Sequence, residues 1–493
     1  MKVKKSFFIT LFILFLYGYT NSSLYGQEMI GLSSSNYAGI NGSILNPSSM
    51  SFSRNYIEVN IISSHTFGKN NSLYIPRRDN RGVLFADGEL PKYNNDNSLL
   101  LFSNKDAKNI FISQRIILPS IMYNYKDHSF GFMAQARAYA SGINIPYEFP
   151  VIAYKGLNYM PIQNINFDNH KFDINAQSWA EFSLLYSKKI YKNLFSQLSA
   201  GISLKYLKGY SAAYMKFDNI KFDIPSDYNI EINNLNSEFG YASPVNLSTN
   251  RIETSPLFIG EGVGFDLGFT YINGKKIHQN TYRMQPCAVE FDEYIYKIGV
   301  SIIDVGQIRY DERTRVHLYD NVSARWNDAK INFNSLDSLF YTLDTLFYGA
   351  PGRSLKSTAF SMGLPTAISI QADYNFYKDF YASGVWVQGI KLFKNSMYRG
   401  ALLAITPRYE TPILEVGIPV SLYNYEYPDL GAYVRIGYFT IGSESLSSLL
   451  GIGNLKGTDI YFSLKFYIQK GKCVNNSIEN CHSFERPLDR GKN

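Results

Sequence analysis

The feature that most constrains this chain is a two-residue period of apolar side chains that returns along most of its length. Residues 262–271, GVGFDLGFTY, place an apolar side chain at every second position, and residues 130–139, 180–187 and 198–205 repeat the pattern. Successive side chains of a β-strand point to opposite faces, so this period indicates strands with one apolar and one polar face. The chain is therefore predicted to be all-β.

Thirteen segments can be counted as strands on this pattern. Single-chain bacterial barrels have an even number of strands, so parity predicts a fourteenth, within residues 209–224 or 308–320. The thirteen lie near residues 56–66, 109–125, 128–141, 177–189, 195–208, 259–272, 294–305, 363–376, 380–393, 399–410, 412–424, 430–441 and 457–468.

The connections between these strands differ in length in a way that points to a membrane. Residues 126–128 and 377–379 are tight turns, whereas the long connections are 68–108, 143–175, 216–256 and 306–361. Loops this long are uncommon in compact soluble domains, but an outer-membrane barrel pairs short periplasmic turns with long external loops. A soluble sandwich or propeller also alternates and is the alternative fold.

Composition favours the barrel over other membrane folds. No apolar run of about 18 residues lies beyond the first 20 positions, which argues against a bundle of membrane helices. Aromatic residues make up 16% of the chain, and tyrosines such as Tyr186, Tyr271 and Tyr438 stand at predicted strand ends, as in aromatic girdles. A lipid-facing sheet cannot leave an open edge. The predicted fold is therefore a closed antiparallel transmembrane β-barrel of about 14 strands.

The first 26 residues have the parts of a secretory signal peptide. Lys2, Lys4 and Lys5 precede an apolar stretch at 7–17, and small or polar residues follow up to Gly26. An anchor helix is the alternative, but the apolar stretch is short and nothing basic follows it. An exported barrel would lie in the cell outer membrane, in contact with its lipid. The predicted organisation is a signal peptide at 1–26, an N-terminal plug segment at 27–55, a barrel at 56–468 and a polar tail at 469–493.

Charge, cysteine and histidine usage exclude several kinds of site. The formal net charge of +7 falls by three when the leader lysines are removed, so it gives no argument for nucleic acid. Cys473 and Cys481, eight residues apart in the tail, could form a disulfide, and Cys287 would be left over. The six histidines show no metal-ligand spacing, and no cofactor is expected.

Charged side chains of both signs remain on the inward face when the apolar face of each strand is taken as lipid-facing. An ion-selective pore would more naturally carry one sign, whereas a balanced set suggests pairs across strands in a narrow interior. We therefore expect an occluded lumen; the alternative is that the charges face channel water unpaired. The predicted inward acids are Glu58, Glu181, Asp266, Asp373, Glu415 and Asp459, and the inward bases are Arg137, Lys205, Lys297, Arg435 and Lys465.

Other local patterns are interpreted as structural. Glycines at 260–268 and 451–457 lack the strand, turn and helix context of a nucleotide loop, and an inward glycine more simply leaves space beside a bulky neighbour. Residues 336–347 have helical spacing, either as a helix over the barrel mouth or as a surface helix packed on loops. No nucleophile elbow or Ser-His-Asp spacing is present, so no catalytic residue is predicted; a barrel enzyme using His65 or His128 is a further alternative.

Several short stretches, taken in order, resemble a family of bacterial outer-membrane barrels. Residues 36–39 (NYAG) and 46–49 (NPSS) stand before the first strand, and 296–306, 364–366, 405–410, 415–419 and 441–443 follow. They resemble a branch of barrels, found in bacteria with type IX secretion and gliding machinery, that is related to the long-chain fatty-acid transporter FadL. The resemblance implies fourteen strands, no catalytic residues, and an N-terminal segment folded inward as a plug, with Asn46 and Pro47 as plug candidates.

Two hypotheses of function follow, from different classes. The first is FadL-like passage of a small hydrophobic compound, with residues 27–55 as the plug. The second is a structural or accessory role, in which the long loops and the tail dock proteins of a secretion or surface machine. Deleting residues 27–55 would separate them, because only a transporter should become leaky to small solutes. The ligand and its binding residues do not follow from the sequence.

Overall fold

The computed structural model describes most of the predicted barrel. The described residues are 28–77 and 99–472, except 103, 158, 169, 194, 227–228, 247–250, 253–255, 275–279, 283–287, 292–293, 328–335, 427, 447–449 and 470. The predicted signal peptide, Cys287, the Cys473 and Cys481 pair and most of the predicted tail lie outside the described residues.

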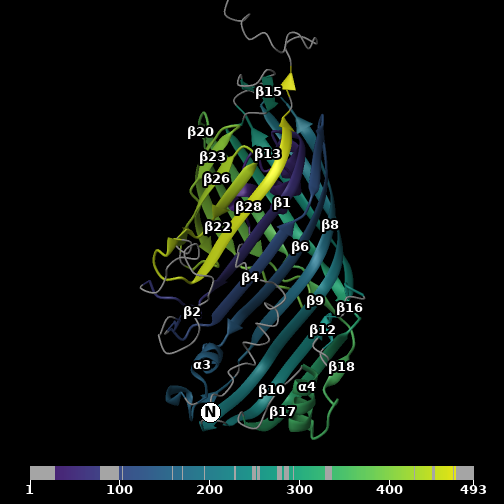
Figure 1. The fold of residues 1–493 in the computed structure, drawn as a ribbon, viewed down its shortest axis with the longest axis vertical. Helices are drawn as coiled ribbons and strands as arrows, with labels where there is room; N and C mark the ends of the chain where they lie inside the picture. Colours follow the sequence, from purple (N-terminus) through teal and green to yellow (C-terminus); the bar gives the residue numbers. More distant parts are fainter. Residues whose placement is uncertain are drawn as a thin grey trace, which may run out of the picture.

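The wall is one antiparallel sheet that closes on itself, because its first strand, β1 (Asn55–Asn70), pairs with its last, β28 (Gly457–Gln469). The register runs from Asn55 opposite Gln469 to Ile62 opposite Leu464. Closure leaves no backbone edge facing lipid. The predicted closed antiparallel barrel of fourteen strands is confirmed (Figure 1).

Some of the fourteen positions around the wall hold two or three shorter strands end to end. Between β1 and β28 the wall contains β4 (Lys108–Ile117), β5 (Ser120–Tyr125), β6 (His128–Ile145), β7 (Asn166–Phe167), β8 (Phe172–Lys192), β9 (Ser196–Ser226), β10 (Asn229–Ala242), β13 (Gly260–Asn273), β16 (Tyr296–Tyr310), β17 (Thr314–Asn327), β18 (Leu355–Ser357), β19 (Phe360–Gly363), β20 (Ala367–Tyr377), β21 (Phe380–Gly389), β22 (Leu402–Glu410), β23 (Leu414–Gly417), β24 (Val420–Tyr423), β25 (Pro428–Leu430), β26 (Ala432–Ile436) and β27 (Phe439–Ser443).

Smaller elements lie inside the barrel or at its ends. Three small sheets are formed by β2 (Leu73–Tyr74) with β3 (Leu100–Leu101), by β11 (Val245–Asn246) with β12 (Arg251–Ile252), and by β14 (Asn280–Tyr282), β15 (Ala288–Phe291) and β29 (Gly471–Lys472). The helical segments are α2 (Ile30–Ser33), η1 (Gly39–Ile44), η2 (Pro47–Phe52), α3 (Glu148–Lys155), η4 (Met160–Ile162) and α4 (Leu336–Tyr348).

The structure corrects the place of the fourteenth strand. Residues 209–224 continue β9, and residues 308–320 lead from β16 into β17, so neither hides a separate position in the wall. The predicted strand at 430–441 instead contains β26 and part of β27, joined by a turn at Gly437 and Tyr438. Gly437 has a φ of +57°, a left-handed conformation that glycine adopts without strain. The apolar alternation continues through this turn, which conceals it in the sequence.

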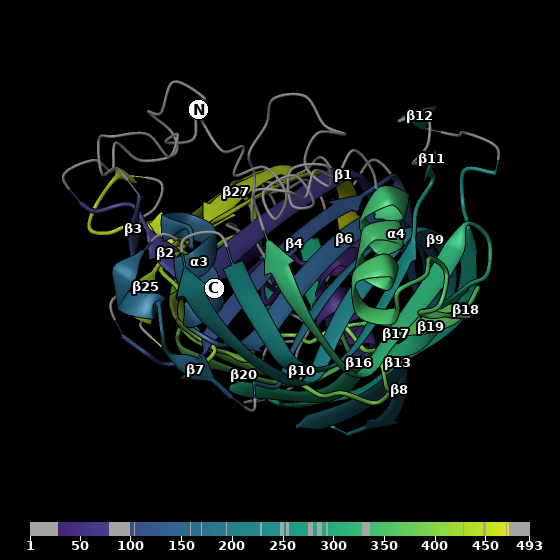
Figure 2. The same cartoon turned by 90° about the horizontal axis from the view of Figure 1, so that it is seen from below.

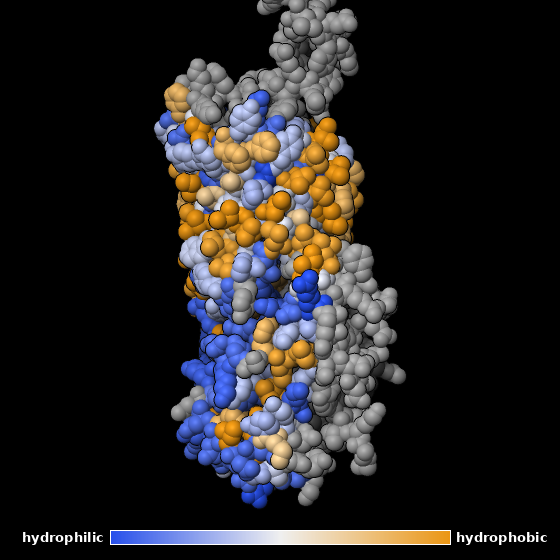
Figure 3. All heavy atoms as spheres, turned by 90° about the vertical axis from the view of Figure 1, so that its left-hand side faces the viewer, coloured by the Kyte–Doolittle hydropathy of each residue, from blue (hydrophilic) through white to orange (hydrophobic). Residues whose placement is uncertain are grey.

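The outward face carries an apolar band near the end with the short turns, here called the turn end. Large apolar side chains are exposed there at alternate positions, for example Val263, Phe265, Leu267 and Phe269 of β13. Figure 3 shows orange side chains gathered around the upper half of one face. A barrel surface that faces lipid requires such a band. None of the described helices is long and apolar enough to cross a membrane.

At the opposite end, here called the loop end, one side of the wall continues far past the band. β9 has 31 residues and β8 has 21, whereas a tilted membrane strand needs only about 9–11. β10 pairs with the far part of β9 and with β17, and we call this projecting wall the extension. The predicted loops 143–175, 216–256 and 306–361 are therefore corrected: they contain long strand ends, because these strands do not stop at the membrane band.

The extension has an apolar core of its own. Phe172 of β8 and Phe217 of β9 stack with ring centroids 4.3 Å apart, and Phe149 of α3 and Phe340 of α4 pack into the same cluster. Figure 2 shows α4 inside the curve of the wall, beside β17. The helix predicted at residues 336–347 is thus confirmed, and it packs on the wall.

Candidate functional site

Residues 28–54, here called the N-terminal segment, lie inside the barrel. They contain α2, η1 and η2, and nearly all of their side chains are buried. Glu28 lies beside the connection between β21 and β22 at the loop end, and Arg54 leads into β1 at the turn end. The segment therefore runs through the lumen from one end to the other. Its apolar residues Met29, Leu32, Ile40, Ile44 and Met50 pack in one cluster with wall residues Ile117, Met122, Met133, Leu185, Tyr433 and Tyr461.

The turn at Asn46, Pro47 and Ser48 is seated on glycines of the wall. The Asn46 side chain accepts a hydrogen bond from Ser48 N at 3.0 Å and donates one to a carbonyl of β13 at 3.1 Å. A Cβ atom on Gly201 would overlap Ser48 N, and a Cβ atom on Gly268 would overlap Asn46 Oδ1. These inward glycines thus leave space for the N-terminal segment itself.

A buried network in the middle of the barrel joins the segment to the wall. Arg399 binds Glu28 at 2.5 Å and Asp304 at 3.2 Å. Arg137 makes two hydrogen bonds to Asp304, at 2.7 and 2.9 Å, and Lys205 lies 2.8 Å from Asp266. Each of these six charges therefore has an opposite partner, which offsets the loss of its hydration. This central cluster consists of Glu28, Arg137, Glu181, Lys205, Asp266, Asp304 and Arg399.

A second buried network lies nearer the turn end. Arg408 binds Asp373 through two hydrogen bonds, at 3.1 and 2.6 Å, and Glu410 at 2.9 Å. Arg54, at the end of the N-terminal segment, lies 3.1 Å from Glu410. Arg435 pairs with Glu415 at 3.0 Å. The segment is thus held by ion pairs at both of its ends. Lys297 also belongs here, because it donates to Asn36 Oδ1 at 3.0 Å.

The structure places all of the predicted inward charges inside the barrel, although not in one site. Most belong to the two networks above. Glu58 and Lys465 form a separate pair at 3.4 Å, and Glu58 also accepts a hydrogen bond from Ile40 N. Asp459 stands apart from all of them, where it accepts a hydrogen bond from Glu444 N at 3.0 Å.

Sequence reasoning missed several charged residues of the interior: Glu28, Asp304, Arg399, Arg408 and Glu410. The period could have found Arg408 and Glu410, because β22 alternates strictly through them. It could not have found Asp304. Ile303 and Asp304 are both buried, and Asp304 has a φ of 57°, so a bulge reverses the phase of the strand there. Arg399 lies in a connection, where no period applies.

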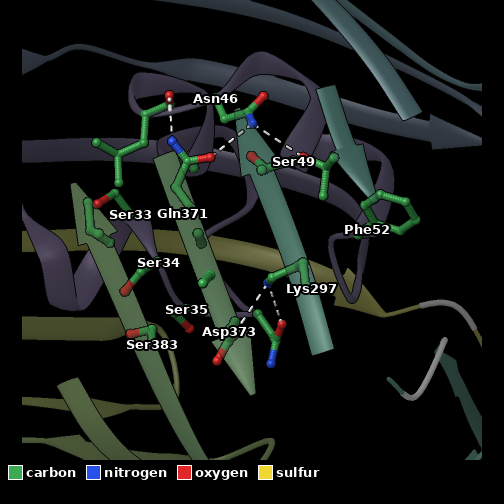
Figure 4. Close-up of a pocket in the computed structure, with 18 of the residues that line it drawn as sticks. Ser33, Ser34, Ser35, Asn46, Ser49, Phe52, Lys297, Gln371, Asp373 and Ser383 are labelled. Atoms are coloured by element: carbon green, nitrogen blue, oxygen red, sulfur yellow. Dashed lines mark hydrogen bonds and ion pairs between the residues drawn. The ribbon is translucent and has the colours of Figure 1, made fainter. Parts of the chain in front are cut away.

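Two pockets remain in the lumen, one beside the N-terminal segment and one at the loop end. A pocket of about 50 Å³ lies between residues 33–36 of the segment and wall residues Gln371, Asp373 and Ser383 (Figure 4). A larger pocket, of about 300 Å³, lies at the loop end between β1, β24 and β28. Within the described ranges, no three His, Cys, Asp or Glu side chains are placed to hold a metal ion.

Comparisons with known proteins give one family and several distant structures. The model of a family described as "Family of unknown function (DUF5723)" matches residues 47–444. No curated protein matches the chain. The TodX deltaS2S3 mutant, a monoaromatic hydrocarbon channel, is 8% identical with a TM-score of 0.37, covering 91% of this chain and 96% of its own. A Pseudomonas aeruginosa FadL homologue is 10% identical with a TM-score of 0.27, covering 90% and 98%. The outer membrane protease OmpT from Escherichia coli is 9% identical with a TM-score of 0.24, covering 85% and 98%. None of these similarities assigns an activity to this chain.

Proposed function

The chain belongs to the Family of unknown function (DUF5723), and we propose that it is a barrel of the cell outer membrane through which small hydrophobic compounds pass when the N-terminal segment moves. The observation that carries this proposal is the lumen itself. It holds the N-terminal segment, with one pocket between that segment and the wall and a larger pocket at the loop end. A gate that moves between two such spaces would connect them.

The way in which the segment is held supports movement. Among the described residues it forms no strand pairing with the wall, so its displacement would break no ladder of the barrel. Its polar contacts are side-chain hydrogen bonds and ion pairs, such as Asn36 with Glu410 and Glu28 with Arg399. Water or neighbouring charges can replace contacts of this kind.

Apolar side chains at the loop end support the proposal that the transported compound is hydrophobic. The extension gathers aromatic rings there, and the connection between α3 and β7 exposes Tyr159, Met160 and Ile165 to solvent. Met160 is 81% exposed. An apolar surface at the entrance would concentrate hydrophobic compounds before they meet the segment.

The test is removal of the gate. Purified protein lacking residues 28–54 should show a large, steady conductance in planar bilayers, whereas the full chain should conduct little. Liposomes carrying the deletion variant should also take up the apolar dye N-phenyl-1-naphthylamine faster than liposomes carrying the full chain. Unchanged conductance and unchanged dye uptake in the deletion variant would refute the proposal.

A second candidate function is an accessory role in a secretion or surface machine, and the extension favours it. This wall stands clear of the apolar band and exposes Tyr341, Tyr348 and Leu355 around α4. A pull-down in detergent with Tyr341→Ser and Leu355→Ser should lose a protein partner that the full chain retains. Equal recovery of all partners by both proteins would count against this role.

We propose neither enzymatic activity nor nucleic-acid binding, and no cofactor. His65 is buried and accepts a hydrogen bond from Met29 N at 3.2 Å, while His128 lies at a turn beside Tyr186. The two histidines thus have structural partners on different parts of the wall. Neither the full chain nor a variant with His65 or His128 substituted should hydrolyse lipid or peptide substrates.

A further inference from the structure

The larger of the two pockets has features of a ligand site. We call it the loop-end pocket; its volume is about 300 Å³, at the lower limit of small-molecule sites, which span about 300–1,000 Å³. It lies at the loop end, on the side of the N-terminal segment where that segment begins. Glu444 connects the two, because it accepts a hydrogen bond from Ile30 N at 2.6 Å.

Two of the three acids that line this pocket, Glu444 and Asp459, differ from the acids of the networks described above; the third, Asp429, pairs with Lys69. Glu444 is 6% exposed and Asp459 is 2% exposed, and neither forms an ion pair with any Lys or Arg of the described chain. Their hydrogen bonds come from backbone amides, Ile30 N and Glu444 N. The buried acids of the two networks around the N-terminal segment, together with Glu58, all have ion pairs: Glu28, Glu58, Glu181, Asp266, Asp304, Asp373, Glu410 and Glu415. In the extension, Asp344 and Glu148 are also buried, and neither forms an ion pair with a described Lys or Arg.

The lysines that line the same pocket have other partners, and Lys69 keeps its partner within the lining. Asp429 also lines the pocket, and the Lys69 ammonium lies 5.8 Å from the centre of the Tyr423 ring. Lys69 is bound by Asp429 at 2.5 Å, and the Lys456 ammonium lies 5.3 Å from the centre of the Phe102 ring. Neither of them pairs with Glu444 or Asp459. The pocket therefore keeps two buried acidic side chains without an ion pair, whereas the two networks around the N-terminal segment pair all of theirs.

The walls of the pocket are apolar and aromatic. Phe67 and Tyr423 meet with ring centroids 4.6 Å apart, and Leu402 and Ile452 also line the space. Aromatic faces attract cations, and apolar walls take up a hydrocarbon body.

We propose that the loop-end pocket binds a small organic cation, an ammonium group on an apolar body. The ammonium donates hydrogen bonds to Glu444 and Asp459, and the body lies against Phe67 and Tyr423. If the barrel is the conduit proposed above, this pocket lies at its entrance; only that role of the pocket rests on the proposed function. Binding can be measured without passage, so either proposal can fail alone.

Calorimetry on the full chain in detergent tests the site with two probes of the same shape. At pH 8 the protein should bind 2-phenylethylammonium at least about tenfold more tightly than 2-phenylethanol, because only the first carries a charge-assisted donor. Equal affinity for the two probes, or binding of neither, overturns the proposal, whether or not dye uptake supports the conduit.

Variants locate the site. Glu444→Gln with Asp459→Asn should bring the affinity for the ammonium down to that for the alcohol, whereas Glu426→Gln should leave the preference unchanged. Glu426 is an acid of the same end that lies outside the lining and accepts a bond from Asn71. Should the double variant fail to fold, Ile452→Trp fills the mouth from a side chain 58% exposed and should abolish ammonium binding. Undiminished binding in the folded variants would place the ligand elsewhere and overturn the assignment.

Discussion

Gly268 faces the N-terminal segment, whereas Gly384 lies on the outward face of β21. A Cβ atom on Gly268 would overlap Asn46 Oδ1, whereas a Cβ atom on Gly384 would meet nothing within 4 Å. Gly268→Ala should therefore displace the turn at Asn46, since overpacking of this kind costs about 1–3 kcal/mol. The expected result is higher conductance in planar bilayers and faster proteolysis within residues 28–54.

Gly384→Ala is the control, because it adds the same methyl group to the outward face of the same barrel, between the inward residues Ser383 and Val385. It should leave conductance and proteolysis as they are in the full chain. Equal effects of the two substitutions would mean that seating of the Asn46 turn does not hold the segment.

Arg399 is the residue whose loss should loosen the segment most. It is 2% exposed and pairs with both Glu28 and Asp304. Arg399→Met leaves Glu28 without a cation, and breaking a buried ion pair costs about 3–5 kcal/mol. The thermal unfolding midpoint should fall and conductance should rise. Arg309→Met, at a side chain 69% exposed, should change neither; a similar fall in both variants would contradict this role for Arg399.

The residue scale also shows what the two-residue period can and cannot predict. It led to the inward positions of acids such as Glu181 and Asp266, because a regular strand fixes the face of every side chain. It failed at Asp304, where a bulge places two successive residues on the same side. Glu28 and Arg399 lie outside the strands, so their meeting depends on the tertiary fold alone.

At the scale of elements, Glu238 ties the extension together and makes it sensitive to pH. Burial alone would raise the pKa of Glu238, but hydrogen bonds from Tyr214 and Lys356 and the charge of Lys394 outweigh it, so the pKa lies below its ordinary value. A depressed pKa stabilises the folded extension above the unfolded pKa of about 4.3, and this stability is lost as pH falls through the folded pKa.

Hydrogen exchange of β10 and α4 measures this dependence. Between neutral pH and about pH 3 the full chain should lose more protection than Glu238→Gln, because the variant has no carboxylate to protonate. At neutral pH the variant should be less protected by about 1.5–3 kcal/mol, the range for a hydrogen bond to a charged group. Parallel loss in both proteins would assign the pH dependence to other acids of the extension.

The element scale is where sequence prediction was least complete. Strand positions in the band could be predicted, since lipid on one side enforces strict alternation. Beyond the band this constraint ends, and β10 carries register shifts near Leu235 that break the period. The predicted loops at 216–256 and 306–361 therefore concealed paired strands.

At the scale of the whole molecule, the even number of strands and the closure of the sheet could be predicted from the sequence. The contents of the lumen could not. A balanced set of inward charges favoured an occluded interior, and the pairs now described show how those charges are compensated. The segment at 28–54 has no strand period of its own. Its expected position as a plug came from the resemblance alone, and its gating role stays a proposal.

Closure itself gives the last prediction. The pairing of β1 with β28 ends at Asn55 opposite Gln469, so a chain ending at Lys472 retains every rung of this seam. It should assemble in lipid and keep the heat-dependent gel migration of a folded barrel. A chain ending at Phe462 loses the rungs from Leu464 to Gln469 and leaves the edge of β1 facing lipid, where each unpaired backbone group costs several kcal/mol. It should not assemble, and a folded, heat-modifiable product from that chain would show that the barrel closes by some other pair of strands.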